Sequence, residues 1–354
     1  MKKNLLMCLA LLTAGCSSSQ SDFQSPQEIN RLAFGSCCKP RNYPQNMFSA
    51  IEKRQPDLFL MLGDNIYGDT EDMNLLKEKY QELAETPGFA SLRRSCPLLA
   101  IWDDHDYGVN DGGRHYPKKQ QSERIFLDFF EPGQQSPRSR RPGLYTSHLY
   151  GPVGRRIQII VLDCRYFRDE LPKTEWDHTK DYVGWYEATM NPELTLLGER
   201  QWQWLDRQLS VPADVRIIVS SIQVLAHEKG MENWGHYPHE RQRLFGLLKK
   251  HQVKNTLALS GDVHFAEISK KNIGAYPFYD FTSSGLTHTS KSWPLAKNHY
   301  RVGKAVDQLN AGIIDIDWQA RRFILRIIDK ESKDAEVHEI PFDELQFSKS
   351  EPSP

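Results

Sequence analysis

A series of short apolar runs, each ending abruptly in polar residues, constrains the fold of this chain more than any other feature of its sequence. Six of these runs have the length and composition of buried strands, and they span residues 29–35, 57–62, 97–102, 156–162, 215–220 and 256–260. Helix-forming segments lie between them, at residues 45–53, 73–83, 197–209 and 240–250. Strands that alternate with helices predict an α/β fold.

The remaining segments fit one large domain over residues 29–345, with a disordered tail at 346–354. Two alternating strands near the end, 312–318 and 322–328, predict a hairpin that adds antiparallel character. Residues 108–155 are rich in Arg, Gly and Pro, and residues 171–195 are rich in aromatic and charged side chains. We interpret both segments as insertions that cover the active face.

Four of the strand ends carry the kinds of side chain that bind metals. They read Phe34-Gly35-Ser36-Cys37-Cys38, Leu62-Gly63-Asp64-Asn65-Ile66-Tyr67-Gly68-Asp69, Ile101-Trp102-Asp103-Asp104-His105-Asp106-Tyr107-Gly108 and Ser260-Gly261-Asp262-Val263-His264. Aspartates also bend turns and cap helices, which would explain any one of these ends. Four in series are much harder to explain in this way. Crowded carboxylates repel one another unless cations compensate them, so the sequence predicts bound metal ions.

These elements, in this order, resemble the PhoD-type alkaline phosphatases and phosphodiesterases of the calcineurin-like metallophosphoesterase superfamily. The superfamily pattern is Asp-x-His, Gly-Asp-x-x-Asp, Gly-Asn-His-Asp/Glu, a lone His, and Gly-His-x-His. This chain departs from it as the PhoD branch does, with Gly-Ser-Cys, Gly-Asp-x-x-Tyr, Trp-Asp-Asp-His-Asp and Gly-Asp-Val-His. The resemblance extends from about residue 32 to at least residue 289, and it implies a sandwich of two mixed β-sheets flanked by helices.

The resemblance also implies two kinds of metal site. Cys37, Asp64 and Tyr67 would bind ferric iron, because a thiolate and a phenolate are anionic donors suited to a highly charged ion. Asp64 would bridge to a second site, in which Asp104 and Asp262 replace the superfamily's Asn and His ligands. A site so rich in carboxylates favours Ca²⁺.

The catalytic residues implied by the resemblance are His105, Asp106 and Arg165. His105 would face the phosphate as general acid or charge stabiliser, and Asp106 would orient it. Arg165 would bind phosphate oxygens in bidentate fashion. The alternative for Arg165 is a structural ion pair with Asp163 or Asp169.

Three further residues have less certain roles within this resemblance. His264 keeps the last position of the terminal motif and would bind either metal or phosphate. Gln223 is the candidate for the superfamily's fourth element, as a phosphate-binding or substrate-binding residue, because PhoD-like chains carry an amide near this point. His227 is the rival for the same role.

The expected reaction is hydrolysis of a phosphate monoester or diester by a metal-activated water, without a covalent enzyme intermediate. Two alternatives remain open: a phospholipase-type phosphodiesterase that acts on membrane lipids, and a surface lipoprotein that binds without catalysis. The formal net charge is only −1, so composition gives no basic face and we expect no specific nucleic-acid binding.

The N-terminus predicts export and membrane anchoring. A basic start, a short apolar run and a small-residue exit form a signal peptide over residues 1–15, and Leu12-Thr13-Ala14-Gly15-Cys16 resembles the bacterial lipobox. Cys16 would be lipidated, residues 16–28 would form a flexible tether, and the protein would sit on a bacterial membrane at the periplasmic or cell surface. Pairing among the other mature cysteines stays open, for Cys37, Cys38, Cys96 and Cys164.

Overall fold

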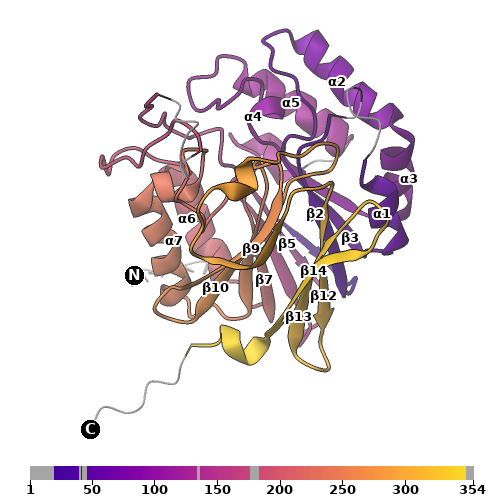
Figure 1. Ribbon diagram of the computed structural model, residues 1–354, viewed down its shortest axis with the longest axis vertical. Coiled ribbons are helices and arrows are strands. Elements are labelled where there is room, and N and C mark those ends of the chain that lie inside the picture. The colour runs from indigo at the N-terminus through magenta and orange to yellow at the C-terminus, as the bar shows by residue number, and fades with distance from the viewer. Residues whose placement is uncertain (1–19, 40, 42–45, 134–135, 176–182, 348–354) are drawn as a thin grey trace, which may run out of the picture.

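Two mixed β-sheets form the centre of the molecule and confirm the predicted sandwich (Figure 1). The computed structural model describes residues 20–347, except 40, 42–45, 134–135 and 176–182. One sheet has eight strands in the order β1-β5-β6-β7-β8-β10-β9-β11. Its strands are β1 (Phe23–Ser25), β5 (Thr146–Tyr150), β6 (Ile157–Val161), β7 (Val215–Val219), β8 (Thr256–Ser260), β9 (Ala266–Asn272), β10 (Pro277–Ser283) and β11 (Arg301–Val306).

The second sheet has six strands in the order β14-β13-β12-β2-β3-β4. They are β2 (Arg31–Gly35), β3 (Leu58–Leu62), β4 (Leu98–Ile101), β12 (Ala311–Asp317), β13 (Arg322–Ile328) and β14 (Asp334–Pro341). The strands β2, β3 and β4 are parallel neighbours, as are β6, β7, β8 and β10 in the first sheet. Parallel strands that are buried on both faces explain why these segments read as continuous apolar runs.

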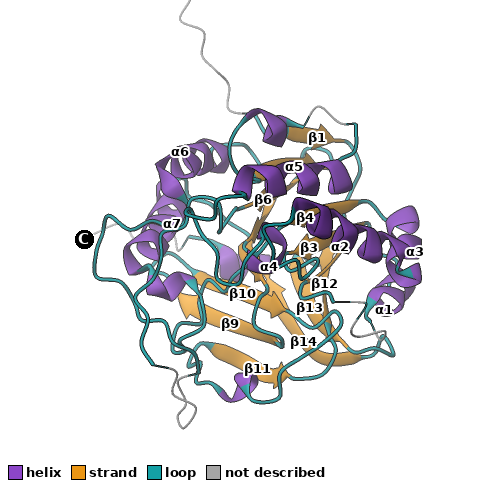
Figure 2. Ribbon diagram, turned by 90° about the horizontal axis from the view of Figure 1, so that it is seen from above, coloured by secondary structure: helices purple, strands orange, loops and turns teal. Residues whose placement is uncertain are grey.

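Helices cover the outer faces of the sandwich. Figures 1 and 2 place α6 and α7 on the side of the eight-stranded sheet and α1 to α3 on the side of the six-stranded sheet. Their bounds are α1 (Phe48–Lys53), α2 (Met73–Glu85), α3 (Pro87–Ser95), α4 (Asp104–Tyr107), α5 (Lys119–Phe130), α6 (Gly198–Leu209) and α7 (Pro238–Lys250). Within the described ranges, none of the helices combines the length and apolar character needed to cross a bilayer.

The two sheets pack against each other through one hydrophobic core. Phe34 of β2 meets Phe281 of β10 edge to face, with ring centroids 4.8 Å apart. Gly312 of β12 lies directly against the Phe34 ring, where a Cβ would come within 2.1 Å of a ring carbon. This close approach requires a glycine near the start of β12, where Gly312 pairs with Phe34 of the neighbouring strand.

Two predictions about the chain's organisation are wrong. Residues 108–155 are only partly an insertion, because they also contain α5 and β5, and β5 is an integral strand between β1 and β6. The flexible tether is wrong for residues 21–25, since β1 pairs in parallel with β5 and Asp22 forms an ion pair with Arg141 at 3.1 Å. Of the predicted tail at 346–354, residues 348–354 lie outside the described residues, as does the signal segment, whereas Gln346 donates to Oδ1 of Asn255 at 2.6 Å and Phe347 packs against Tyr276.

Candidate metal centre

The polar ends of four strands meet at one edge of the sandwich. Cys37 follows β2, Asp64 follows β3, Asp104 follows β4, and Asp262 follows β8. Because β2, β3 and β4 are parallel neighbours and β8 belongs to the facing sheet, residues 225 positions apart come into contact here. The residues that the sequence predicted as metal ligands are therefore brought together.

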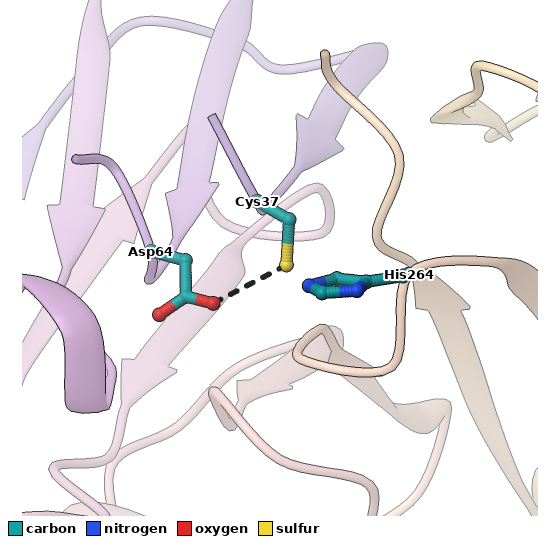
Figure 3. A group of neighbouring side chains, drawn as sticks. All are labelled: Cys37, Asp64 and His264. Carbon is teal, nitrogen blue, oxygen red and sulfur yellow. Dashed lines mark hydrogen bonds between the residues drawn. The ribbon is translucent and has the colours of Figure 1, made fainter. Parts of the chain in front are cut away.

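A thiol, a carboxylate and an imidazole form the first group of potential ligands (Figure 3). The Cys37 Sγ lies 3.4 Å from Oδ2 of Asp64, and the ligand atoms of Cys37, Asp64 and His264 all lie within 4.8 Å of one another. The Tyr67 hydroxyl is 3.3 Å from Oδ2 of Asp64 and 3.1 Å from Nε2 of His264. His264, whose role the sequence left open, is thus placed with the candidate metal ligands.

Four carboxylates form the second group. Oxygens of Asp64, Asp103, Asp104 and Asp262 lie within 4.8 Å of one another. Asp64 belongs to both groups, which is the geometry expected of a bridging carboxylate. Asp103 was not predicted as a ligand, although it lies in the predicted motif. Its Oδ2 atom and Oδ1 of Asp104 are buried and accept no hydrogen bond from any part of the chain that the structure describes.

A third group extends the cluster with two residues that the sequence did not indicate. Oxygens of Asp104, Asp111 and Glu232 lie within 4.8 Å of one another. Asp111 also donates its backbone N–H to Oδ2 of Asp104, at 2.7 Å. Neither Asp111 nor Glu232 ends an apolar run, so no pattern in the sequence marked them.

The backbone is strained at the residues that carry these donors. Cys37, Asp64, Asp262 and His264 all adopt left-handed conformations, with φ of 63°, 51°, 71° and 54°. Each such conformation costs a non-glycine residue roughly 1–2 kcal/mol, and such strain is concentrated at functional sites. Here the left-handed conformation directs each of these side chains away from its strand and toward the cluster of potential ligands.

Burial and mutual repulsion raise the pKa values of several acidic groups in the cluster. Burial raises the pKa of Asp64 well above its usual range, and the neighbouring Cys37 and Asp104 raise it further. Burial, with Asp103 and Asp104 nearby, raises the pKa of Asp262 in the same way. The pKa of the Cys37 thiol rises to about 12, chiefly through burial. Added cations would reverse all these shifts, because they favour the charged forms.

The donor set fits metal ions on these grounds. Buried carboxylate oxygens lack hydrogen-bond donors, and a thiol and a phenol adjoin one of the carboxylates. Burial, with His288 nearby, lowers the pKa of His264 to about 3, so its ring is neutral, as a ligand must be. A thiolate with phenolate and imidazole suits a transition metal, and the carboxylate group suits a hard ion such as Ca²⁺.

His105 is oriented by Asp69 and not by the predicted Asp106. Nδ1 of His105 lies 2.7 Å from Oδ1 of Asp69. Asp106 instead accepts the backbone N–H of Asp103 at 2.6 Å and that of Asn65 at 3.2 Å. Asp106 therefore ties the loop after β3 to the loop after β4. Its role is to position the loops that carry the ligands, which corrects the prediction that it orients the histidine.

Arg165 is an internal ion-pair partner and does not line the cavity above the cluster. Its guanidinium is 0% exposed and forms short ion pairs with Asp103 and Glu232, and it lies 3.8 Å from Asp104. The structure thus favours the ion-pair alternative, but with different partners. Of Arg165, the predicted partner Asp163 bonds to the backbone N–H, at 2.9 Å, and not to the guanidinium.

Neither candidate for the fourth motif lines the cavity. Gln223 is fully buried, and its amide donates to Glu267 at 2.8 Å and to Thr282 at 2.9 Å. His227 stacks against Tyr300, with ring centroids 5.4 Å apart. In the described structure Gln223 therefore bonds to residues of β9 and β10 inside the fold, which corrects its predicted place at the substrate.

Two polar residues near the thiol group were also missed. The Ser284 hydroxyl lies 3.0 Å from Sγ of Cys37, and Nε2 of His288 lies 3.0 Å from the Tyr67 hydroxyl. Both follow β10 within or beside a stretch that resembles the family, but serines and lone histidines in loops carry too weak a signal to single out.

A small cavity of about 90 Å³ opens directly onto the carboxylates. His105 and His264 line it on one side, and Trp185, Tyr186 and Trp293 form aromatic walls. The described cysteines Cys37, Cys38, Cys96 and Cys164 are all free and buried. The Cys37 thiol is therefore available as a ligand.

The sequence profile of the PhoD-like phosphatase family matches residues 32–292, a span that contains all three ligand groups. The chain belongs to the PhoD-like phosphatase family. It is 24% identical to alkaline phosphatase D of Bacillus subtilis (strain 168) over 303 residues, which cover 72% of this chain and 50% of that protein. The chain thus spans about half the length of the curated relative it matches.

Solved structures agree with the fold of this PhoD-like chain. A structure of PhoD superposes with a TM-score of 0.68 at 18% identity, covering 89% of this chain and 68% of that one. A dimetal phosphatase from Danio rerio superposes with a TM-score of 0.51 at 14% identity, covering 89% of this chain and all of the other. These likenesses show that the chain shares its overall fold with both structures.

Replacing Cys37 by serine should remove metal from the thiol group. We expect the Cys37→Ser protein to bind its first metal at least about 10-fold more weakly, because a hydroxyl cannot replace a thiolate donor. Elemental analysis after dialysis against a graded chelator measures this loss. The neighbouring Cys38→Ser is the matched control, since Cys38 is equally buried but belongs to none of the three ligand groups. Equal metal content in both variants would contradict the assignment.

Proposed function

We propose that this protein is a metal-dependent hydrolase of phosphate monoesters or diesters. The observation that carries the proposal is the convergence of Asp64, Asp104 and Asp262 with Cys37 in a buried cluster beneath an open cavity. The family membership supports the same reaction class. When bound, the ions would activate a water for attack and neutralise the phosphoryl oxygens.

The proposed ions are Fe³⁺ and Ca²⁺. Cys37, Asp64, Tyr67 and His264 offer the soft and anionic donors that suit iron. Asp104 and Asp262, with the added oxygens of Asp103, Asp111 and Glu232, offer the carboxylates that suit calcium. Asp64 would contact both kinds of ion.

His105 is the proposed proton donor to the leaving oxygen. Its ring lines the cavity above the carboxylates and packs against Tyr67, with ring centroids 4.0 Å apart. The hydrogen bond from Nδ1 to Asp69 leaves Nε2 as the nitrogen that can face the ester. The chain thus supplies an oriented imidazole beside the predicted metal site.

The activity is tested on the metal-loaded protein with p-nitrophenyl phosphate and bis(p-nitrophenyl) phosphate. We expect turnover of at least one of them, and its loss when the metals are chelated. Phospholipid vesicles in a parallel assay test the phospholipase alternative, which is favoured if vesicles are hydrolysed far faster than either aryl ester. A fully metallated protein that hydrolyses none of these substrates fits the alternative of a binding lipoprotein.

Replacing Asp69 by asparagine should affect esters with poor leaving groups most. An alkoxide needs a proton as it leaves, whereas p-nitrophenolate leaves without one. We expect Asp69→Asn to lower kcat/KM for an alkyl phosphate by at least about 10-fold and for p-nitrophenyl phosphate by less than about 3-fold. The control is Asp128→Asn, an exposed carboxylate on α5. An equal loss on both esters would mean that Asp69 has only a structural role.

We also propose that the protein is exported and anchored through a lipid on Cys16. The support is the lipobox-like Leu12-Thr13-Ala14-Gly15-Cys16. The described fold already begins at Ser21, whose hydroxyl contacts Ser147 at 3.4 Å. An extended chain covers about 3.6 Å per residue, so the fold would start within about 18 Å of the acylated cysteine.

Changing Cys16 to alanine should release the protein from membranes. Lipid attachment requires the thiol, so Cys16→Ala should lose labelling by radioactive palmitate and move from the membrane fraction to the soluble fraction. The matched control is Cys8→Ala, which alters a cysteine within the apolar run and leaves the lipobox intact. Retention of the label in Cys16→Ala would contradict the anchor.

A further inference from the structure

A second, larger cavity adjoins the one above the carboxylates. Its volume is about 780 Å³, and it shares Asn110, Asp111 and Tyr186 with the smaller cavity. Asp69, which holds His105, also lines it. The larger cavity therefore begins beside His105, the proposed proton donor. Figure 2 looks onto this face, with α4 near its centre and loops around it.

Hydrogen bonds between loops hold the walls of this cavity in place. The Tyr186 hydroxyl donates to Oδ2 of Asp111 at 2.8 Å, and the Tyr116 hydroxyl donates to the backbone oxygen of Thr70 at 2.7 Å. The backbone N–H of Arg114 donates to the carbonyl of Arg168 at 2.8 Å. These hydrogen bonds join the described parts of the three loops that form the cavity, which follow β3, α4 and β6.

The lining of the cavity is polar and favours positive charge. Four carboxylates line it, from Asp69, Glu71, Asp111 and Glu170. Glu71 and Glu170 are exposed and form no ion pair within the part of the chain that the structure describes. The apolar part of the lining comes from Val109, Pro117, Leu171 and the rings of Tyr116 and Tyr186.

The lining also contains the cationic side chains of Arg168, which a carboxylate neutralises, and of Lys173, which keeps its charge beside two aromatic rings. Arg168 is buried and its guanidinium pairs with Glu232 at 2.6 Å. The ammonium of Lys173 lies 5.1 Å from the centre of the Tyr186 ring and 5.8 Å from that of Trp185. These ring faces therefore already accept an ammonium group, the geometry in which aromatic side chains attract cations.

We infer that the larger cavity holds the leaving alcohol of the ester, and that it selects polar alcohols that are neutral or carry an ammonium group over alcohols that carry an anion. The inference rests on the proposed phosphoesterase activity. As the water oxygen bonds to phosphorus, the ester P–O bond breaks with its electron pair on the alcohol oxygen. His105 protonates that oxygen and regains a proton from solvent, and the proton lost by the water passes to solvent. The released alcohol then lies beside Asp69, inside the cavity.

Three phosphate monoesters of similar size test the selectivity: choline phosphate, its uncharged isostere 3,3-dimethylbutyl phosphate, and 2-carboxyethyl phosphate. Release of inorganic phosphate gives kcat/KM for each. We expect the cationic ester to exceed the anionic one by about 10-fold at low salt, with the neutral ester between them, because two unpaired carboxylates face the alcohol. The ratio should shrink as salt is added.

Glu71→Gln combined with Glu170→Gln should reduce the cation-to-anion ratio to within about 3-fold, since both carboxylates become neutral without a change of shape. The matched control is Glu331→Gln with Asp343→Asn, two exposed carboxylates outside the lining, which should keep the wild-type ratio.

The outcomes separate the inference from the function on which it rests. If p-nitrophenyl phosphate and all three esters resist hydrolysis, the proposed phosphoesterase fails. If p-nitrophenyl phosphate is hydrolysed but the three alcohols react equally, or the anionic one reacts fastest, the phosphoesterase stands and the leaving-alcohol assignment is overturned. A preference for the cation that the double variant leaves unchanged also overturns the assignment.

Discussion

Several carboxylates are held close together at the strand ends. Their mutual repulsion is the constraint on which the rest of the structure depends. Asp103, Asp104 and Asp262 lie within one buried cluster, and a buried carboxylate is stable only when it is paired or bound to a cation. Among the described residues, two buried guanidinium groups reach the cluster: Arg165 forms short ion pairs with Asp103 and Glu232, and Arg168 pairs with Glu232 at 2.6 Å. Burial raises the pKa of Asp103, but Arg165 limits this rise, to about 6. Two guanidinium groups cannot balance its six carboxylates, so the cluster has the excess of negative charge that suits bound cations.

The ligands are positioned by backbone geometry more than by side-chain packing. Each donor follows directly on a buried strand, and left-handed residues at Cys37, Asp64 and Asp262 turn the chain at that point. Asp106 then joins two of these turns, by accepting N–H groups from the loops after β3 and β4. Burial raises the pKa of Asp106 to about 8, while the hydrogen bonds from Asp103 and Asn65 favour its ionised form. A strained turn that is held by several hydrogen bonds fixes a ligand without closing the site.

The strands and most of the ligands could be predicted because both leave local patterns. The runs at β2, β3, β4 and β8 are apolar throughout and stop at a dense polar motif, and this pattern survives without knowledge of the partner strands. Asp111 and Glu232 leave no such pattern, since each is a single acid in a loop that long-range folding brings to the cluster. The role of Asp69 was missed, and those predicted for Asp106 and for Arg165 at the phosphate differ from the structure, for a related reason. Motif order gives a residue's place along the chain, but which carboxylate meets His105 depends on how two loops cross.

The two adjoining cavities divide the chemistry from the choice of substrate. The smaller one presents His105 and the candidate metal ligands at the strand ends, and loop residues such as Trp185, Tyr186 and Trp293 complete its walls. The larger one is lined by the loops after β3, α4 and β6, and side chains in such loops can change without moving a strand. Asp69 belongs to the second cavity and yet orients the histidine of the first. An alcohol that occupies the larger cavity therefore contacts the carboxylate that positions its own proton donor, so recognition and proton transfer are coupled through one hydrogen bond.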